Sequence, residues 1–191
     1  MSQPDDLYSF VCRGDLAKQS LNTALPRPPR FGNGDLASMK QALSYDMLDK
    51  ERLAQAQRMA VVYVALHAFE NAVRDLVMKA MAEAHSAAWW EKVPEKIRKK
   101  VESRKDEEAK FRWHGSRGAS DISYCDFGDL SSIIITNWPV FEPVLITHEW
   151  VKTILGPLER SRNCIMHGGS LANEDVERIG MLIRDWIRQT G

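Results

Sequence analysis

The chain has 191 residues and a mass of 21.7 kDa, a size that fits one hydrophobic core. Hydrophobic residues make up 44% and charged residues 27% of the sequence, which excludes a disordered or fibrous protein. The 26 Lys and Arg balance the 26 Asp and Glu, so the formal net charge is zero. Since non-specific binding to nucleic acid depends on neutralising phosphates, this balance excludes a protein that binds by bulk charge, but not one with a local basic patch.

The sequence also argues against a membrane or secreted protein. The longest apolar run, Met59 to Leu66, is eight residues long, whereas a spanning helix needs roughly 20. No basic segment followed by an apolar one stands at the N-terminus. The cysteines, Cys12, Cys125 and Cys164, are odd in number and lack the spacing of zinc ligands. We therefore expect a cytoplasmic protein with no metal and no cofactor.

The first 33 residues differ in composition from the rest. Residues 25–34, with the sequence LPRPPRFGNG, contain three prolines and two glycines, which interrupt any regular element. We predict that residues 1–33 form an N-terminal extension or arm and that residues 34–191 form a helical domain.

A long helix is predicted early in that domain. Residues 46–85 contain no Gly and no Pro, and their apolar residues recur at steps of three and four. This pattern indicates one long helix or two nearly collinear ones. A further helix is predicted from Pro94, which suits a first-turn position, to about Trp113.

The segment 129–141 reads as a helix in its wider pattern. Its apolar residues again step by three and four, although residues 133–136 taken alone also fit a buried strand. The wider spacing favours a helix.

Two more helices are predicted towards the C-terminus. The first spans residues 147–167, with Gly156-Pro157 expected to interrupt or kink it and Gly168-Gly169 to end it. The second is capped by Ser170 or Asn173 and runs to about Gln189. Nothing else indicates a sheet, so the sequence predicts an all-α fold, a bundle of about five to six helices with a long early helix.

Polar residues able to bind phosphate gather at the end of the helix predicted over residues 147–167. Arg160, Asn163 and His167 share a helical stripe, and Arg162 flanks it. An arginine fork binds phosphate bidentately, and a histidine exchanges a proton near neutral pH. The alternative is a polar cap with cations near the negative end of the helix dipole.

A second polar stripe lies within the long helix. It consists of His67, Glu70, Asn71 and Arg74, at offsets of three, four and seven. These residues either form a partly buried cluster or, alternatively, an ordinary i, i+4 ion pair on a solvated face.

The third candidate is a basic segment. Residues 92–118 carry ten Lys or Arg against five acids, with Phe111, Trp113 and His114 interleaved. Such a segment can combine phosphate contacts with base stacking. The alternative is a charged helix face with Trp113 turned into the core. The candidate RNA-binding residues of this segment are Lys99, Lys100, Arg104 and Arg112.

The sequence RNCIMH at residues 162–167 resembles the R-x4–6-H motif of the HEPN (higher eukaryotes and prokaryotes nucleotide-binding) superfamily. The surrounding order is also similar, with a long early helix carrying Glu70 and Arg74, then the segment 129–141, then LERSRNCIMHGG at 158–169. The chain is most similar to the subfamily named after a eukaryotic nuclear mRNA-surveillance endoribonuclease, which also occurs in bacterial proteins. The resemblance spans roughly residues 45–190.

This resemblance implies a HEPN-like helical fold and a metal-independent endoribonuclease. The resemblance implies that Arg162 holds the scissile phosphate and that His167 acts as general acid or base or positions the phosphate. Asn163 would orient the phosphate or donate a hydrogen bond, and Glu70 would be a supporting acid. His67, Asn71 and Arg74 would support these residues or contact RNA, and Arg160 is a further candidate for RNA binding. The substrate's own 2′-hydroxyl would be the nucleophile, leaving a 2′,3′-cyclic phosphate.

The resemblance also implies a homodimer in which two motif helices form one composite site for RNA. Bacterial members usually serve as toxins or phage-defence effectors, so an antitoxin or defence partner protein is expected. One departure concerns control, because members silenced by nucleotide transfer carry a tyrosine where this chain has Gly169. Since some HEPN domains only bind, the alternative is a non-catalytic helical module that binds RNA, nucleotide or a partner protein.

Overall fold

The computed structural model of the chain describes residues 33–111 and 113–191. The predicted arm, as far as residue 32, and Arg112 lie outside these ranges. The chain divides into two compact units at Asp49 and Lys50. The first unit contains the helix α2 (Asn33–Ala42) and the 3₁₀ turn η1 (Tyr45–Met47).

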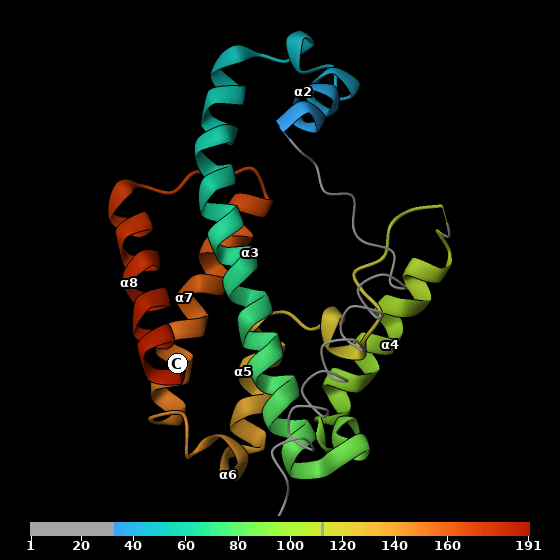
Figure 1. The fold of residues 1–191 in the computed structure, drawn as a ribbon, viewed down its shortest axis with the longest axis vertical. Coiled ribbons are helices and arrows are strands. Elements are labelled where there is room, and N and C mark those ends of the chain that lie inside the picture. Colours follow the sequence, from blue (N-terminus) through green and yellow to red (C-terminus); the bar gives the residue numbers. More distant parts are fainter. Residues whose placement is uncertain (1–32, 112) are drawn as a thin grey trace, which may run out of the picture. The chain divides into compact units, whose positions relative to one another are not determined.

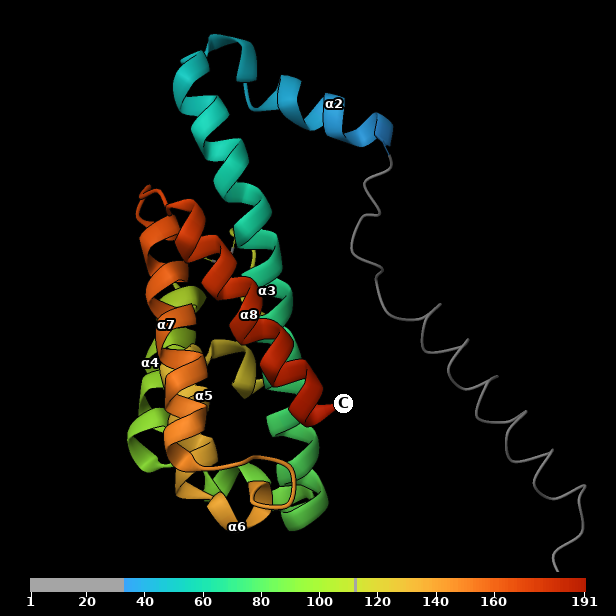
Figure 2. The ribbon, with the colours of Figure 1, turned by 90° about the vertical axis from the view of Figure 1, so that its left-hand side faces the viewer.

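The second unit contains the other helices, drawn in Figures 1 and 2. In chain order these are α3 (Lys50–His85), η2 (Ser86–Lys92), α4 (Glu95–Ala109), η3 (Asp121–Tyr124), α5 (Phe127–Thr136), α6 (Trp138–Phe141), α7 (His148–Met166) and α8 (Asn173–Thr190). The described residues contain no strand, so the prediction of an all-α fold is confirmed. None of the helices described is both long and apolar enough to cross a membrane.

The long early helix is one continuous element of 36 residues, α3. Its buried apolar residues follow the predicted steps of three and four, from Met59 through Leu66 and Val73 to Met81. This stripe faces the core of the second unit, because every residue in it has less than a tenth of its surface exposed.

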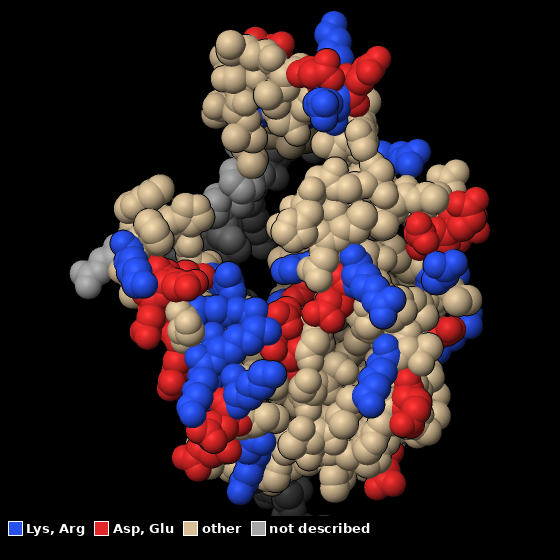
Figure 3. All heavy atoms as spheres, turned by 180° about the vertical axis from the view of Figure 1, so that it is seen from behind, with Lys and Arg blue, Asp and Glu red and all other residues tan. Residues whose placement is uncertain are grey.

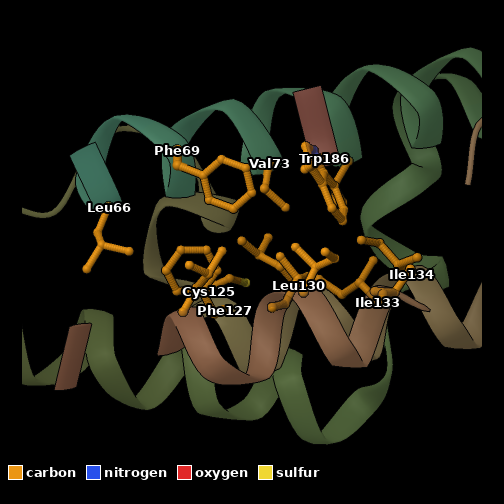
Figure 4. Packing of buried hydrophobic residues seen from close by; sticks show 14 of the residues in the cluster. Leu66, Phe69, Val73, Cys125, Phe127, Leu130, Ile133, Ile134 and Trp186 are labelled. Carbon is orange, nitrogen blue, oxygen red and sulfur yellow. The ribbon is translucent and has the colours of Figure 1, made fainter. Parts of the chain in front are cut away.

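The core lies where α3, α5, α7 and α8 meet. Helix α7 packs against α5, α8 and α3. Figure 4 shows Phe69 and Val73 on one side of this core, facing Phe127 and Leu130 on the other. Phe69 packs against the Phe127 ring at 6.0 Å and against the edge of Trp186 at 5.9 Å, measured between ring centroids. Burial of these large side chains holds the elements that position the polar residues described below.

Residues 129–141 are helical, as the wider spacing predicts, and the strand alternative for 133–136 is wrong. The segment forms two helices, α5 and α6, separated at Asn137. Helix α5 begins earlier than predicted because Asp126 caps it and forms a reciprocal capping box with Asp129.

Of the two effects predicted for Gly156-Pro157, the interruption is wrong, because α7 continues as one helix through Pro157, and the kink stays a prediction. Buried Ile154, Leu155 and Leu158 fix the helix to the core on both sides of the proline. Thr153, whose carbonyl group would accept the hydrogen bond that proline cannot donate, is exposed, so water can satisfy that carbonyl.

The N-cap of the last helix also differs from the prediction. Ala172 occupies the cap position of α8, and no side chain caps the helix. Neither Ser170 nor Asn173 therefore serves as the cap. Glu174 and Asp175 instead place negative charge in the first turn, where it interacts favourably with the helix dipole.

Candidate active site

A pocket of about 460 Å³ is lined by all four predicted site residues of α3, together with Arg104 from α4 and Arg162 from α7. Four arginines and two carboxylates contribute to its lining, which leaves a formal excess of two positive charges. The lining consists of Tyr63, His67, Glu70, Asn71, Arg74, Arg104, Arg117, Ser123, Tyr124, Cys125, Asp126, Arg162 and Met166. Such a pocket suits an anionic group.

Glu70 is the buried centre of this pocket. Only 3% of the residue is exposed, so the alternative of an ion pair on a solvated face is wrong. Its carboxylate accepts a hydrogen bond from Arg74 on the same helix. Its second oxygen lies 3.8 Å from Nε of Arg162, which α7 supplies. One buried carboxylate therefore orients two guanidinium groups from different helices.

Arg74 is held in place by further contacts. Its guanidinium group donates to the backbone carbonyl of Cys125 at 2.8 and 3.2 Å and to Oδ1 of Asn71 at 2.8 Å. Asn71 in turn donates to the backbone carbonyl of His67 at 3.0 Å. The polar stripe predicted on the long helix is therefore one connected network.

The end of α7 presents Asn163 and His167 to solvent. Arg162 donates to Oδ1 of Asn163 at 3.1 Å. His167 is the C-cap residue of α7 and is exposed, and it is not part of the pocket lining. The predicted motif is thus divided, with Arg162 inside the pocket and the imidazole outside it on the adjoining surface.

The two glycines after His167 end the helix, as predicted. Gly168 has a φ of +78°, a left-handed conformation that favours glycine, and the Gly169 amide donates to the Cys164 carbonyl at 2.8 Å. A Cβ atom on Gly169 would come within 2.8 Å of that carbonyl oxygen. A tyrosine at this position would therefore require the backbone to move.

Two predicted RNA contacts lie away from the pocket. Arg160 lines a separate pocket of about 300 Å³ between α7 and α8, with Asp175 and Arg178. Lys99 is on the exposed face of α4 and pairs with Glu95 at 2.7 Å.

Two cations of the basic segment are paired with carboxylates from outside it. Lys100 lies 2.8 Å from Asp129 and 3.0 Å from Asp126. Arg104 lies 2.9 Å from Asp126 and 3.1 Å from Asp129, and it also donates to the Tyr124 carbonyl. These two cations hold α4 to the start of α5, although Arg104 also reaches the pocket wall.

Burial alone would lower the pKa of Lys100 and raise that of Asp126, but the ion pairs outweigh it. Hydrogen bonds from Arg104, the Asp129 backbone and Lys100 hold the pKa of Asp126 well below its ordinary value. The same carboxylates raise the pKa values of Lys100 and Arg104 above their ordinary ranges. Burial raises the pKa of the Cys125 thiol to about 12, so the thiol stays protonated at neutral pH.

The profile of the Swt1-like HEPN family matches residues 64–191, which is more than half of the chain. The chain belongs to this family. The matched range begins in α3 before His67 and includes the whole of α7 and α8, so it contains the Arg162–His167 motif and every pocket residue except Tyr63. No curated protein and no solved structure matches the chain at a significant level.

The aromatic residues of the basic segment are exposed in this HEPN domain. Trp113 has 83% and Phe111 57% of the residue surface exposed, so the alternative of Trp113 in the core is wrong. Figure 3 shows Lys and Arg gathered on the side of the molecule where α4 lies, with Asp and Glu beside them.

Sequence reasoning missed several residues of the HEPN pocket. Tyr63, Arg117 and the Cys125 carbonyl reach it from positions without a motif. The Asp126–Asp129 pair had a usable signal, because an acidic residue three positions after a cap residue is the pattern of a capping box. In the part of the chain that the structure describes, no group of three or more His, Cys, Asp or Glu is placed to hold a metal ion.

Proposed function

We propose that this HEPN protein is an endoribonuclease that cleaves RNA by attack of the substrate's 2′-hydroxyl, without a metal ion. The observation that carries the proposal is the buried Glu70 carboxylate holding Arg74 and Arg162 in one positively charged pocket. An oriented guanidinium can stabilise the charge that develops on phosphate oxygens in the transition state.

The motif residues have distinct roles in this proposal. Arg162 binds the scissile phosphate, and Asn163, whose side chain accepts a hydrogen bond from Arg162, orients it. His167 exchanges protons with the 2′-hydroxyl or the leaving oxygen. Glu70, being buried, acts on Arg162 and does not reach the solvent side of the pocket.

The complete site requires a second copy of the chain, because His167 lies outside the pocket that contains Arg162. An apolar pocket of about 480 Å³ adjoins the site and shares Tyr63 and Met166 with it. Met166 and Val64 expose 54% and 65% of their surface beside these pockets. Exposed apolar surface at the edge of a polar site fits a homodimer interface that brings two motifs together.

The cellular role that we propose is that of a cytoplasmic toxin or phage-defence effector with an antitoxin or defence partner protein. Its support is family membership together with the free cysteines Cys125 and Cys164, which fit a reducing compartment.

A second candidate function is a non-catalytic module that binds RNA, nucleotide or a partner protein. In a single copy of the chain His167 is exposed and lies outside the pocket that contains Arg162, which favours this binding function over catalysis. Binding without cleavage would distinguish this module from the nuclease.

The decisive experiment measures cleavage of total RNA or tRNA in EDTA. We expect cleavage by the wild type, with Arg162→Ala and His167→Ala each slower by ~100-fold or more. Arg160→Ala is the matched control, because this arginine is two residues from Arg162 but lines another pocket, and it should cleave at nearly the wild-type rate. Cleavage that survives both motif substitutions would contradict the proposed mechanism.

A further inference from the structure

A second large pocket adjoins the candidate active site. It has a volume of about 580 Å³ and is formed by the end of α4 and the residues that follow it. Its lining consists of Arg104, Glu107, Glu108, Phe111, Trp113, His114, Gly115, Ser116 and Arg117. Three rings, those of Phe111, Trp113 and His114, therefore line this pocket, and none of them is used in the site described above.

These rings are presented to solvent and not packed into the core. Trp113 is 83% exposed, and its ring centroid lies 6.5 Å from Phe111 and 5.6 Å from His114, both in edge-on contacts. Since Trp113 is 83% exposed, most of the surface of its indole ring is open to solvent in spite of these two neighbours. Exposing this much aromatic surface is unfavourable unless a ligand covers it.

The aromatic pocket is continuous with the candidate active site through shared side chains. Arg104 and Arg117 line both pockets. Arg117 is held by Glu108, with Nε 3.3 Å from the carboxylate, and Tyr124 donates to the same carboxylate at 2.8 Å. A bound strand that extends from one pocket into the other would therefore pass two guanidinium groups, those of Arg104 and Arg117.

The charges differ between the two pockets. Glu107 and Glu108 balance the charges of Arg104 and Arg117 in the aromatic pocket, so this pocket lacks the positive excess of the pocket around Arg162. Carboxylate oxygens can instead accept hydrogen bonds from the N–H groups on base edges, and an open indole face can stack on a base. The aromatic pocket thus suits a base, whereas the pocket around Arg162 suits a phosphate.

We propose that the aromatic pocket binds an unpaired base of the RNA strand whose phosphate occupies the pocket around Arg162. The placement of that phosphate rests on the proposed function. The substrate class is then single-stranded RNA or a loop, because a base within a duplex cannot leave its stack to lie against Trp113 without unpairing.

The test is direct binding to a short single-stranded oligoribonucleotide, labelled for anisotropy and carrying 2′-O-methyl groups so that it has no 2′-hydroxyl nucleophile and cannot be cleaved. We expect Trp113→Leu to weaken binding ~10-fold, the loss of about one stacked base. Trp113→Phe keeps an aromatic face and should bind within a few-fold of the wild type. The same strand in a duplex should bind more weakly and be insensitive to either substitution.

Ile187→Leu is the matched control, since Ile187 is an exposed apolar residue on α8 away from both pockets. Because Trp113 is exposed, Trp113→Leu should leave the thermal unfolding midpoint unchanged. A loss of binding would then come from the missing indole ring and not from unfolding. Three outcomes would each overturn the proposal. The Trp113→Leu variant could bind the single strand as tightly as the wild type, it could lose the same affinity for the single strand and the duplex, or the wild type could fail to bind the single strand.

This experiment separates the two proposals because it needs no cleavage. Ring-dependent binding by a protein that cuts no RNA would support the base pocket and reject the nuclease. If the wild type cleaves RNA and the Trp113→Leu variant binds and cleaves it equally well, the nuclease would be supported and the base pocket rejected.

Discussion

At the scale of single residues, burial separates two ion pairs that look alike in the sequence. Glu70 pairs with Arg74, and Glu95 with Lys99, each across one helical turn. The Glu70 side chain is 4% exposed and that of Glu95 is 68% exposed. Only the first pair is desolvated, so only there does the loss of one charge leave another without compensation.

We therefore expect Glu70→Gln to lower the free energy of unfolding by about 3 kcal/mol, because Arg74 and Arg162 would lose their buried counter-charge. Glu95→Gln should change it by less than about 0.5 kcal/mol. Urea denaturation at neutral pH measures both. Similar small changes in the two variants would show that Glu70 does not hold the arginines.

The residues of the candidate site could be predicted only where their spacing along one helix places them on the same face. The spacing of Glu70, Asn71 and Arg74 predicted a shared face. It could not show that the Cys125 carbonyl holds Arg74, because that contact joins residues 51 positions apart. It also could not separate Arg160 from Arg162, since which of two nearby arginines faces the pocket depends on how α7 packs on α8.

At the scale of elements, the start of α5 joins a helix cap to an ion-pair network. Asp126 accepts a hydrogen bond from the Asp129 amide at 3.0 Å, and the same side chain pairs with Arg104 and Lys100 on α4. The cap thus fixes the backbone whose Cys125 carbonyl holds Arg74. The charge count over residues 92–118 could not reveal this, because the neutralising aspartates lie outside that segment.

Asp126→Asn separates the charge from the cap, since asparagine caps a helix as well as aspartate. The folded-state pKa of Asp126 lies below its ordinary value of 3.8, so its contribution is present above that pH and is lost as the pH falls below it. We expect the variant to be less stable by about 1.5 kcal/mol at pH 7.

The difference in urea midpoint between wild type and Asp126→Asn should shrink between pH 4 and pH 2. Glu102→Gln is the control, because Glu102 is exposed in the middle of α4, away from both ends of the helix. A difference that is independent of pH would contradict the role of the Asp126 charge.

The helices could be predicted largely from periodicity, and their boundaries could not. The steps of three and four in α3 depend only on one face being buried, which the sequence encodes directly. Pro157 is the exception, because propensity alone predicts a break that packing of its neighbours overrides. The break at Asn137 depends on tertiary packing in the same way.

Replacing Gly156, which lies within α7, and Gly169, which follows α7, by alanine should change the stability of the protein in opposite directions. A Cβ on Gly156 would meet nothing within 4 Å, so Gly156→Ala should stabilise the protein by about 0.5–1 kcal/mol. A Cβ on Gly169 would approach the Cys164 carbonyl oxygen to 2.8 Å, so Gly169→Ala should destabilise it and slow cleavage by displacing His167. Thermal unfolding and the cleavage assay measure both. Equal stability of the two variants would contradict the tight turn.

At the scale of the whole molecule, the equal numbers of basic and acidic residues are accompanied by direct ion pairs between segments. Lys100, Arg104 and Lys105 are paired with aspartates from other segments, so these three cations of α4 are not a free phosphate-binding surface. In the proposed function, the charge that binds phosphate is that of the pocket around Arg162. Binding should therefore depend on a few phosphates, with a shallow dependence on salt.

The last prediction concerns the homodimer that we propose, on which the composite site would depend. Val64 shares a helical stripe with His67 and Asn71 and is 65% exposed, so in a dimer it would be buried next to the pocket. Val64→Glu should weaken self-association ~10-fold or more, because a buried carboxylate without a partner opposes the interface. Cleavage should fall in parallel and recover partly at high protein concentration.

Ile187→Glu is the matched control, since it places the same charge on an exposed apolar position of α8, which is 58% exposed. Sedimentation velocity across a concentration series reads out association, and the RNA assay at the same concentrations reads out activity. A monomeric Val64→Glu variant that cleaves RNA at the wild-type rate would show that one copy of the chain is sufficient. Cleavage would then have to proceed with the His167 of the same chain, which would require the end of α7 to move towards Arg162.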